Sequence, residues 1–196
     1  VFSEDVIENY GAKRFFACGY DYFCNIMYKR KKPKHVYEVL QWHLPTKIFF
    51  DFDEKDMSKR EDFKCSVKKY LDHVSSKLGV HYVILHASTE NKCSMHVIFQ
   101  IFLENMQAVK QFVKETLEEC PCPYVDESVY SRNRSFRLLH SKKKGKSDFS
   151  TLIRTSLDEK YCPNELFETL IQSYEPTPRS CFYDKYKHEI KIISVP

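Results

Sequence analysis

Two carboxylates at the end of an apolar segment have the spacing of a cation site. Asp51 and Asp53 close the segment 46–53, TKIFFDFD, whose aromatic and β-branched residues predict a strand. Because side chains alternate along a strand, both carboxylates point to one face and the apolar side chains beside them point to the other. Two carboxylates about 7 Å apart can bracket a divalent cation, and without a counter-charge they raise each other's pKa. An acidic turn is the competing interpretation, since two more acids follow directly.

A cation, a hydroxyl and an imidazole alternate along the segment 92–96, KCSMH. This segment leads into a second predicted strand, 95–103, so Lys92, Ser94 and His96 share a face and can bind phosphate oxygens through their side chains. The chain has only 4 glycines and contains neither GxGxxG nor GxxxxGKS/T, which excludes the Rossmann fingerprint and the P-loop. A hairpin turn that happens to contain a histidine is the competing interpretation.

A third acid, Asp126, precedes a strongly basic segment. Within that segment, residues 134–139 predict a strand on which Arg137 points away from its apolar neighbours and can therefore enter a site. Arginine suits bidentate contact with phosphate. A second basic cluster occupies residues 29–34, and two such clusters favour a polyanion such as nucleic acid, although solvated surface loops would look the same. The other basic candidates from the two clusters are Lys29, Arg30, Arg132, Arg134 and Lys143.

The composition is that of a folded domain. The chain has 196 residues, of which 42% are hydrophobic and 30% charged, so it can bury a core and is not intrinsically disordered. No apolar run approaches the roughly 18 residues of a membrane span, so no membrane partner is expected. The 8 cysteines lack a metal-binding spacing and are expected to be reduced thiols of an intracellular protein. Because the chain starts at Val1 rather than Met, we expect it to be a fragment.

Helix and strand patterns alternate along the chain. Apolar residues recur at steps of three and four along 59–78, which predicts an amphipathic helix that ends at Gly79. The order of elements favours an α+β fold, a mostly antiparallel sheet with helices packed on one face. The other predicted elements are strands at 36–42, 46–53, 81–88, 95–103 and 134–139, a helix marked by Val109, Phe112, Val113 and Leu117, and a last helix at 164–173.

Three motifs stand in order along the chain: DFD after an apolar strand, KCSMH before VIF, and DESVYSRNRSFRLLHSKKKGK over residues 126–146. In this order they resemble the motifs of the archaeo-eukaryotic primase superfamily, and the third motif resembles in particular its PrimPol-like primase-polymerases. The resemblance runs from about residue 11 to residue 150. It departs in the first motif, which is Asp-x-Asp here and Asp-x-Glu in the animal members.

The resemblance implies an RRM-like catalytic core of the archaeo-eukaryotic primase type. Residues 1–196 would form one primase-polymerase core, with 1–45 as an N-terminal subregion and 46–196 as the metal- and nucleotide-binding subregion, and the zinc-binding region that follows this core in the family would not be in this chain. Tyr37 would test the sugar for a 2′-hydroxyl. The catalytic ligands of Mg²⁺ or Mn²⁺ would be Asp51, Asp53 and Asp126. The nucleotide would be bound by Lys13, Lys92, Ser94, His96, Arg137 and Lys143. The nucleic acid would be bound by Lys29, Arg30, Arg132 and Arg134.

The implied activity is template-directed transfer of nucleotides to a primer 3′-hydroxyl by two-metal catalysis, in replication restart and DNA damage tolerance. The partners would be a single-stranded DNA template with its primer, a dNTP or NTP and, through regions outside this chain, a single-strand-binding protein. The location would be the nucleus or mitochondrion of a eukaryote, or the host cell of a virus. Two alternatives stay open: a metal-dependent nuclease or phosphohydrolase that uses the same acids, and a non-catalytic module that binds single-stranded nucleic acid.

Overall fold

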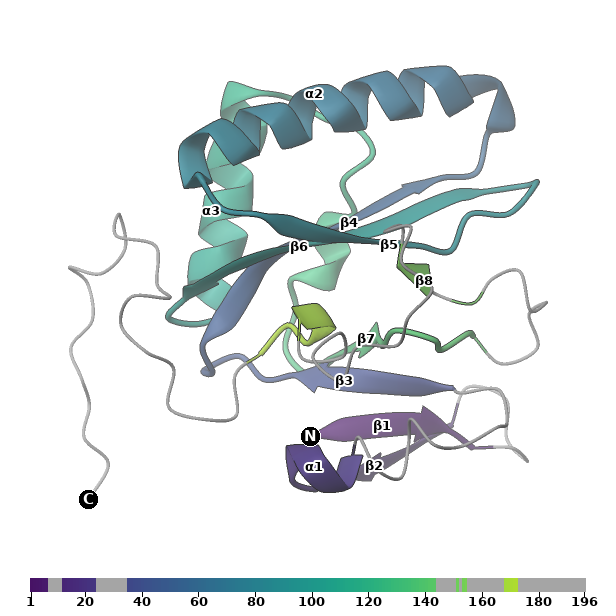
Figure 1. Ribbon diagram of the computed structural model, residues 1–196, viewed down its shortest axis with the longest axis vertical. Helices are drawn as coiled ribbons and strands as arrows, with labels where there is room; N and C mark the ends of the chain where they lie inside the picture. Colours follow the sequence, from purple (N-terminus) through teal and green to yellow (C-terminus); the bar gives the residue numbers. More distant parts are fainter. Residues whose placement is uncertain (7–11, 24–34, 144–150, 152, 155–167, 173–196) are drawn as a thin grey trace.

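The chain forms an α+β structure in which a pair of long helices and two antiparallel sheets are stacked in three layers (Figure 1). The computed structural model describes residues 1–6, 12–23, 35–143, 151, 153–154 and 168–172. Its helical elements are α1 (Tyr20–Phe23), η2 (Met57–Lys59), α2 (Arg60–Leu78), α3 (Met106–Glu119) and η3 (Glu127–Val129). Its strands are β1 (Phe2–Asp5), β2 (Lys13–Phe16), β3 (Val36–Leu40), β4 (Thr46–Glu54), β5 (Tyr82–His86), β6 (Cys93–Leu103), β7 (Arg134–Arg137) and β8 (Ile153–Arg154).

The strand orders are β4-β6-β5-β8 in one sheet and β2-β1-β3-β7 in the other. Helices α2 and α3 cover one face of the first sheet, and the second sheet lies on the opposite side of it (Figure 1). The second sheet combines three strands from the first 45 residues with β7, which comes from the basic segment after Asp126. The N-terminal segment and the segment after Asp126 therefore meet in one sheet.

Strand β4 packs on both of its faces because its aromatic residues alternate in direction. On the helix side, Phe50 lies edge-on to Tyr70 of α2, with ring centroids 5.2 Å apart. On the other side, Phe49 contacts Phe136 of β7 at 5.0 Å and Tyr130 at 5.2 Å. One strand thus joins the helix layer to the second sheet, and its residues lie at the centre of the main hydrophobic core.

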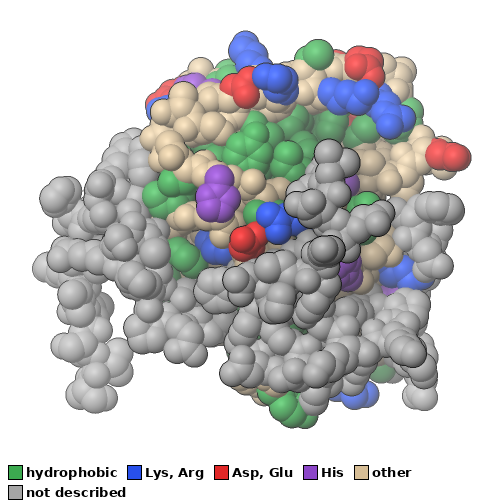
Figure 2. All heavy atoms as spheres, in the orientation of Figure 1, with side chains coloured by type: hydrophobic (Ala, Val, Ile, Leu, Met, Phe, Trp, Pro, Cys, Tyr) green, Lys and Arg blue, Asp and Glu red, His purple; other side chains and the backbone are tan. Residues whose placement is uncertain are grey.

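The two long helices have the amphipathic pattern that the sequence predicts, and α2 ends at Gly79, whose φ of +62° suits a residue without a side chain. The hydroxyl of Tyr70 lies 2.7 Å from that of Thr116, a buried contact that joins α2 to α3. Charged side chains follow the outer side of α2, at the top of Figure 2. No helix within the described ranges has the length and apolar character that a membrane crossing requires. The buried residues of α2 are Phe63, Val67, Tyr70, Leu71, Val74 and Leu78.

The predicted α+β class is confirmed, with one difference in organisation. The strands predicted for one sheet divide between two, because β3 pairs with β1 and β7 and neither β3 nor β7 pairs with β4. The four short elements β1, β2, α1 and β8 were not predicted, since they contain two to four residues and show no apolar periodicity. Half of the predicted helix 164–173 falls outside the described residues, and the described half, 168–172, leaves the helical conformation after Thr169.

A buried polar cluster fastens the segment 168–172 between β3 and β4. Glu38, which is fully buried, accepts hydrogen bonds from the backbone N–H groups of Ile171 and Gln172 at 2.8 and 2.9 Å. Lys47, also buried, donates to the backbone carbonyl of Glu168 at 3.0 Å. Burial lowers the pKa of Lys47 to about 8, although the charges of Glu38 and Glu168 oppose this shift. Because buried charges are costly without partners, this cluster holds the two sheets in one arrangement.

We predict that the free energy of unfolding of the wild type, measured relative to that of Lys47→Met, rises between pH 8 and pH 9.5. In this range the folded protein has released the Lys47 proton, whereas the unfolded chain, with a pKa near 10.5, still binds it, so raising the pH favours folding. The expected gain is about 2 kcal/mol over the range. Urea unfolding at both pH values measures it, with the exposed Lys64→Met as control. An unchanged difference between wild type and Lys47→Met would contradict the lowered pKa.

Candidate active site

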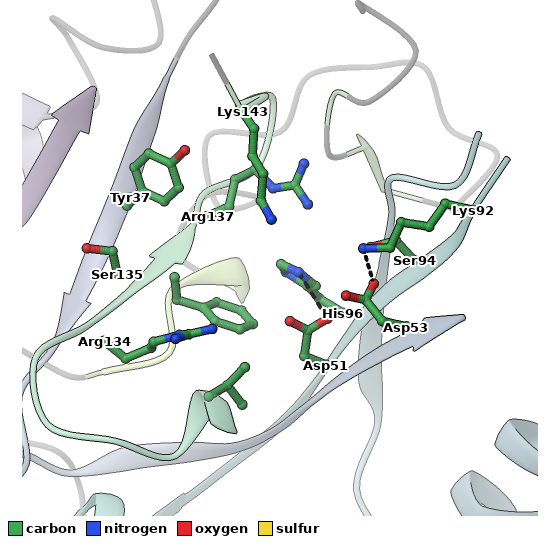
Figure 3. A pocket seen from close by; sticks show the side chains of 12 residues that line it. Tyr37, Asp51, Asp53, Lys92, Ser94, His96, Arg134, Ser135, Arg137 and Lys143 are labelled. Carbon is green, nitrogen blue, oxygen red and sulfur yellow. Dashed lines mark ion pairs between the residues drawn. The ribbon is translucent and has the colours of Figure 1, made fainter. Parts of the chain in front are cut away.

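The register of β4 against β6 brings two motifs of the sequence face to face. In this antiparallel pair Asp51 lies opposite His96, and Asp53 lies opposite Ser94. Residues directly opposite each other in such a pair share a face of the sheet, with Cβ atoms about 4.5–5.5 Å apart. The two acids and the Ser-x-His motif therefore form one cluster (Figure 3).

A cavity of about 60 Å³ lies between this cluster and the second sheet. Figure 3 shows Tyr37 of β3 and Arg137 of β7 on the side opposite Asp51 and Asp53. Three lining residues were not named as site residues by the sequence analysis, Val129, Ser135 and Phe136, because nothing in their types distinguishes them from ordinary strand or turn residues. The predicted residues that line the cavity are Tyr37, Asp51, Asp53, Lys92, Ser94, His96, Arg134, Arg137 and Lys143.

Asp51 lies in an environment that opposes its ionisation. Burial raises the pKa of Asp51 to about 7, and the nearby charges of Asp53 and Asp126 add to this shift. The Oδ1 atoms of Asp51 and Asp53 are buried and accept no hydrogen bond of good geometry. Lys92 approaches Asp53 Oδ1 to 2.7 Å, so this acid has a cation beside it. Asp51 Oδ1 is therefore buried without a hydrogen bond, whereas Asp53 Oδ1 is paired with the charge of Lys92.

His96 is held as a neutral side chain. Its ring is buried and lies on the ring of Phe136, with centroids 4.3 Å apart. Burial lowers the pKa of His96 well below its ordinary value, and the cationic charges of Arg137, Lys143 and Lys92 act in the same direction. Its Nε2 lies 3.5 Å from Asp51 Oδ1, and its Nδ1 is buried without a hydrogen-bond partner. A buried ring nitrogen without a partner can bind a polar atom of a substrate.

Three cations surround the acids from three different segments. Lys92 comes from the turn before β6, Arg137 ends β7, and Lys143 follows it (Figure 3). Burial lowers the pKa of Lys143, and the charges of Arg137 and Lys92 lower it further, so these cations crowd one another. With both carboxylates ionised, these three cations leave one positive charge in excess, and Arg134, which also lines the cavity, adds another. This excess favours an anionic ligand.

Asp126 is brought next to Asp51 through the backbone. Its N–H donates to the carbonyl of Asp51 at 2.8 Å, while its carboxylate caps η3 by accepting from the N–H of Ser128 at 3.0 Å. Asp126 is not among the residues that line the cavity. Within the described part of the chain, no three His, Cys, Asp or Glu side chains gather closely enough to hold a metal ion. The predicted third acid is therefore adjacent to the pair, with its side chain engaged elsewhere.

Lys13 does not line the cavity but contacts Tyr37, which does. Its Nζ lies 3.2 Å from the centroid of the Tyr37 ring and 3.1 Å from Asp5 Oδ1, and it is not a lining residue. Asp5 also accepts a hydrogen bond from the Tyr37 hydroxyl at 2.9 Å. The sequence analysis missed Asp5 because it belongs to a short strand without an apolar pattern.

The residues predicted to bind nucleic acid are dispersed. Arg134 lines the cavity, whereas the guanidinium of Arg132 lies 5.9 Å over the ring of Trp42, a cation–π distance. Lys29 and Arg30 lie outside the described residues.

We predict that Asp51→Asn is more stable than wild type at pH 8 in the presence of EDTA. Because the folded-state pKa of Asp51 is raised, folding loses stability as the pH rises from about 4 to 7, and an asparagine avoids this loss. The gain is at most about 4 kcal/mol and should shrink towards zero near pH 4. Urea unfolding at the two pH values measures it, with the exposed Glu90→Gln as control. A variant less stable than wild type at pH 8 would contradict this electrostatic picture.

Comparison with known proteins gives one distant relative. No family model matches the chain. The chain is similar to the "Putative primase" of Ostreid herpesvirus 1 (isolate France), with 23% identity over 180 residues. The match covers 70% of this chain and 15% of that protein, so the chain spans a small part of the length of its relative. This similarity supports a primase-like relationship.

Proposed function

We propose that this chain is the catalytic core of a DNA primase-polymerase, which transfers nucleotides to a primer 3′-hydroxyl under the direction of a single-stranded template. The observation that carries the proposal is the register of β4 and β6, which sets Asp51 and Asp53 opposite His96 and Ser94. Four cations border the same cavity: Lys92, Arg134, Arg137 and Lys143. The order of the motifs and the distant primase relative point to the same chemistry.

The acidic pair fits Mg²⁺ or Mn²⁺. The buried Oδ1 atom of Asp51 accepts no hydrogen bond, that of Asp53 is paired with Lys92, and carboxylate oxygen atoms are the ligands these ions prefer. Such ions are commonly held by one or two carboxylates, with water and substrate phosphates as the other ligands, so an incomplete set of protein ligands is no obstacle. Asp126, beside Asp51, is the candidate third ligand. Bound metal would polarise the α-phosphate and favour ionisation of the primer hydroxyl.

The residues around the acids suit the triphosphate of the incoming nucleotide. Lys92, Arg137 and Lys143 would neutralise its oxygen atoms and the pyrophosphate that leaves. Neutral His96 and the hydroxyl of Ser94 can donate hydrogen bonds to the same group. In phosphoryl transfer, positioning and charge neutralisation supply most of the catalysis, so a rigid set of cations on two sheets is a suitable framework.

The same cations favour nucleotidyl transfer over hydrolysis. A nuclease with Asp51 and Asp53 at its centre would use water as the nucleophile and would not need Lys92 to hold a triphosphate. Arg134 lines the cavity, and Arg132 lies just before it in the chain. Both would bind template phosphates in the proposed function. Roles in replication restart and damage tolerance, a single-strand-binding partner and a nuclear, mitochondrial or host-cell location remain predictions from the resemblance.

We predict that the protein extends a labelled primer on a longer single-stranded DNA template with dNTPs and Mn²⁺ or Mg²⁺. Lys92→Ala should reduce kcat/KM by about 100-fold or more, because it removes a charge from the triphosphate site. Lys64→Ala, on the exposed side of α2, is the matched control and should retain the wild-type rate. Primer shortening that survives Lys92→Ala would instead establish a nuclease.

Asp126→Asn tests the third acid separately. Asparagine caps a helical turn about as well as aspartate, and the backbone bond to Asp51 does not involve the side chain, so the fold should remain intact. We expect primer extension to fall by about 100-fold or more, because the variant removes a charged metal ligand. Thermal unfolding checks the fold beside the activity assay. Full activity in Asp126→Asn would restrict the metal site to Asp51 and Asp53.

A further inference from the structure

Asp5 uses both oxygen atoms of its carboxylate to hold two neighbouring side chains. Oδ2 accepts a hydrogen bond from the hydroxyl of Tyr37 at 2.9 Å. Oδ1 accepts one from Lys13 Nζ at 3.1 Å, and the same Nζ lies 3.2 Å from the centroid of the Tyr37 ring. Each of the three side chains thus contacts the other two. The tyrosine is held at its hydroxyl and on one face of its ring.

The strand register makes this arrangement a property of the sheet. Asp5 lies directly opposite Lys13 in the β1–β2 pair, and Ser3 lies opposite Tyr37 in the β1–β3 pair. Asp5 is therefore diagonal to Tyr37 on the same face, a separation that a tyrosine side chain can span. The carboxylate of Asp5 is largely buried, with 13% of its side chain exposed, so its bonds to Tyr37 and Lys13 are weakly screened by solvent.

This arrangement decides what Tyr37 offers to the cavity. A tyrosine hydroxyl has one proton to donate, and here that proton is directed at Asp5 rather than at a ligand. Burial and the hydrogen bond to Asp5 raise the pKa of Tyr37, so the hydroxyl remains protonated. Tyr37 nevertheless lines the cavity that contains Asp51 and Asp53. Because the hydroxyl proton is engaged, a bound nucleotide would contact the aromatic ring of Tyr37.

We propose that Asp5 is a positioning residue that fixes the ring of Tyr37 as a steric wall and thereby makes the site prefer deoxyribonucleotides to ribonucleotides. The inference rests on the proposed polymerase function. Lys13 has a supporting role, since it covers the ring face while its charge is balanced by Asp5. The wall discriminates by exclusion of a 2′-hydroxyl, because the Tyr37 proton is already engaged. Steric rejection of one added hydroxyl is typically worth about 100-fold.

The test is insertion of one nucleotide opposite dC in a primed template, with kcat and KM measured for dGTP and for GTP. Asp5→Ala and Tyr37→Phe should each lower the dGTP preference about tenfold, through a lower KM for GTP. Because both changes release the same ring, the double variant should lose no more than either single variant. Glu4→Ala is the matched control, since Glu4 lies next in the chain and pairs with Arg14 at 3.7 Å. It should keep the wild-type preference.

Several outcomes would overturn the inference. A preference within twofold of wild type in Tyr37→Phe or in a folded Asp5→Ala would do so, as would independent, multiplicative losses in the double variant. If Asp5→Ala fails to fold by circular dichroism, Tyr37→Phe decides alone, because it removes one oxygen atom and keeps the ring. If wild type inserts no nucleotide, the proposed function fails, and calorimetric titration with dGTP and GTP in Mn²⁺ still decides the inference. Tighter dGTP binding that Tyr37→Phe reduces would support it, and equal or absent binding would refute it.

Discussion

The burial of the Asp51 carboxylate beside that of Asp53 is the constraint on which the rest of this site depends. Two carboxylates on one face of an apolar strand, partly removed from water, cannot both ionise cheaply, and the raised pKa of Asp51 expresses that cost. The chain meets this cost with cations from separate segments: Lys92 beside β6, Arg137 on β7 and Lys143 beyond it. The aromatic side chains of β4 contribute the burial that keeps the strand in place despite this charge.

The site lies between two sheets, so its geometry depends on how the sheets pack. Phe136 of β7 contacts both Phe49 and His96, and this small apolar contact sets the spacing between Arg137 on one side and the acids on the other. The buried cluster of Glu38 and Lys47 holds the same two sheets through the segment 168–172. Changes that loosen this cluster should therefore alter the cavity as well as the stability of the fold.

With only 4 glycines, the chain has to carry out the proposed binding of phosphate by means other than a glycine-rich loop. Here long cationic side chains line a cavity between strands of the two sheets. The geometry of such a site depends on the rotamers of its side chains. It therefore also depends on the residues that fix those rotamers. Asp5 does this for Tyr37, and the ring of Phe136 does so for His96.

Local pattern was sufficient to predict the long elements and the direction of the key side chains. Alternation along 46–53 placed Asp51 and Asp53 on one face, periodicity along 59–78 predicted α2, and Gly79 marked its end. Local pattern could not predict that the strands divide between two sheets, that Asp5 lies against Tyr37, or that Glu38 binds the backbone at Ile171. These features come from pairing between segments as many as 133 residues apart, some of them strands of four residues. The sequence by itself determined which residues carry charge and which face they share, because those properties are local. Only the tertiary structure decided which faces meet, because strand pairing depends on the packing of the whole core.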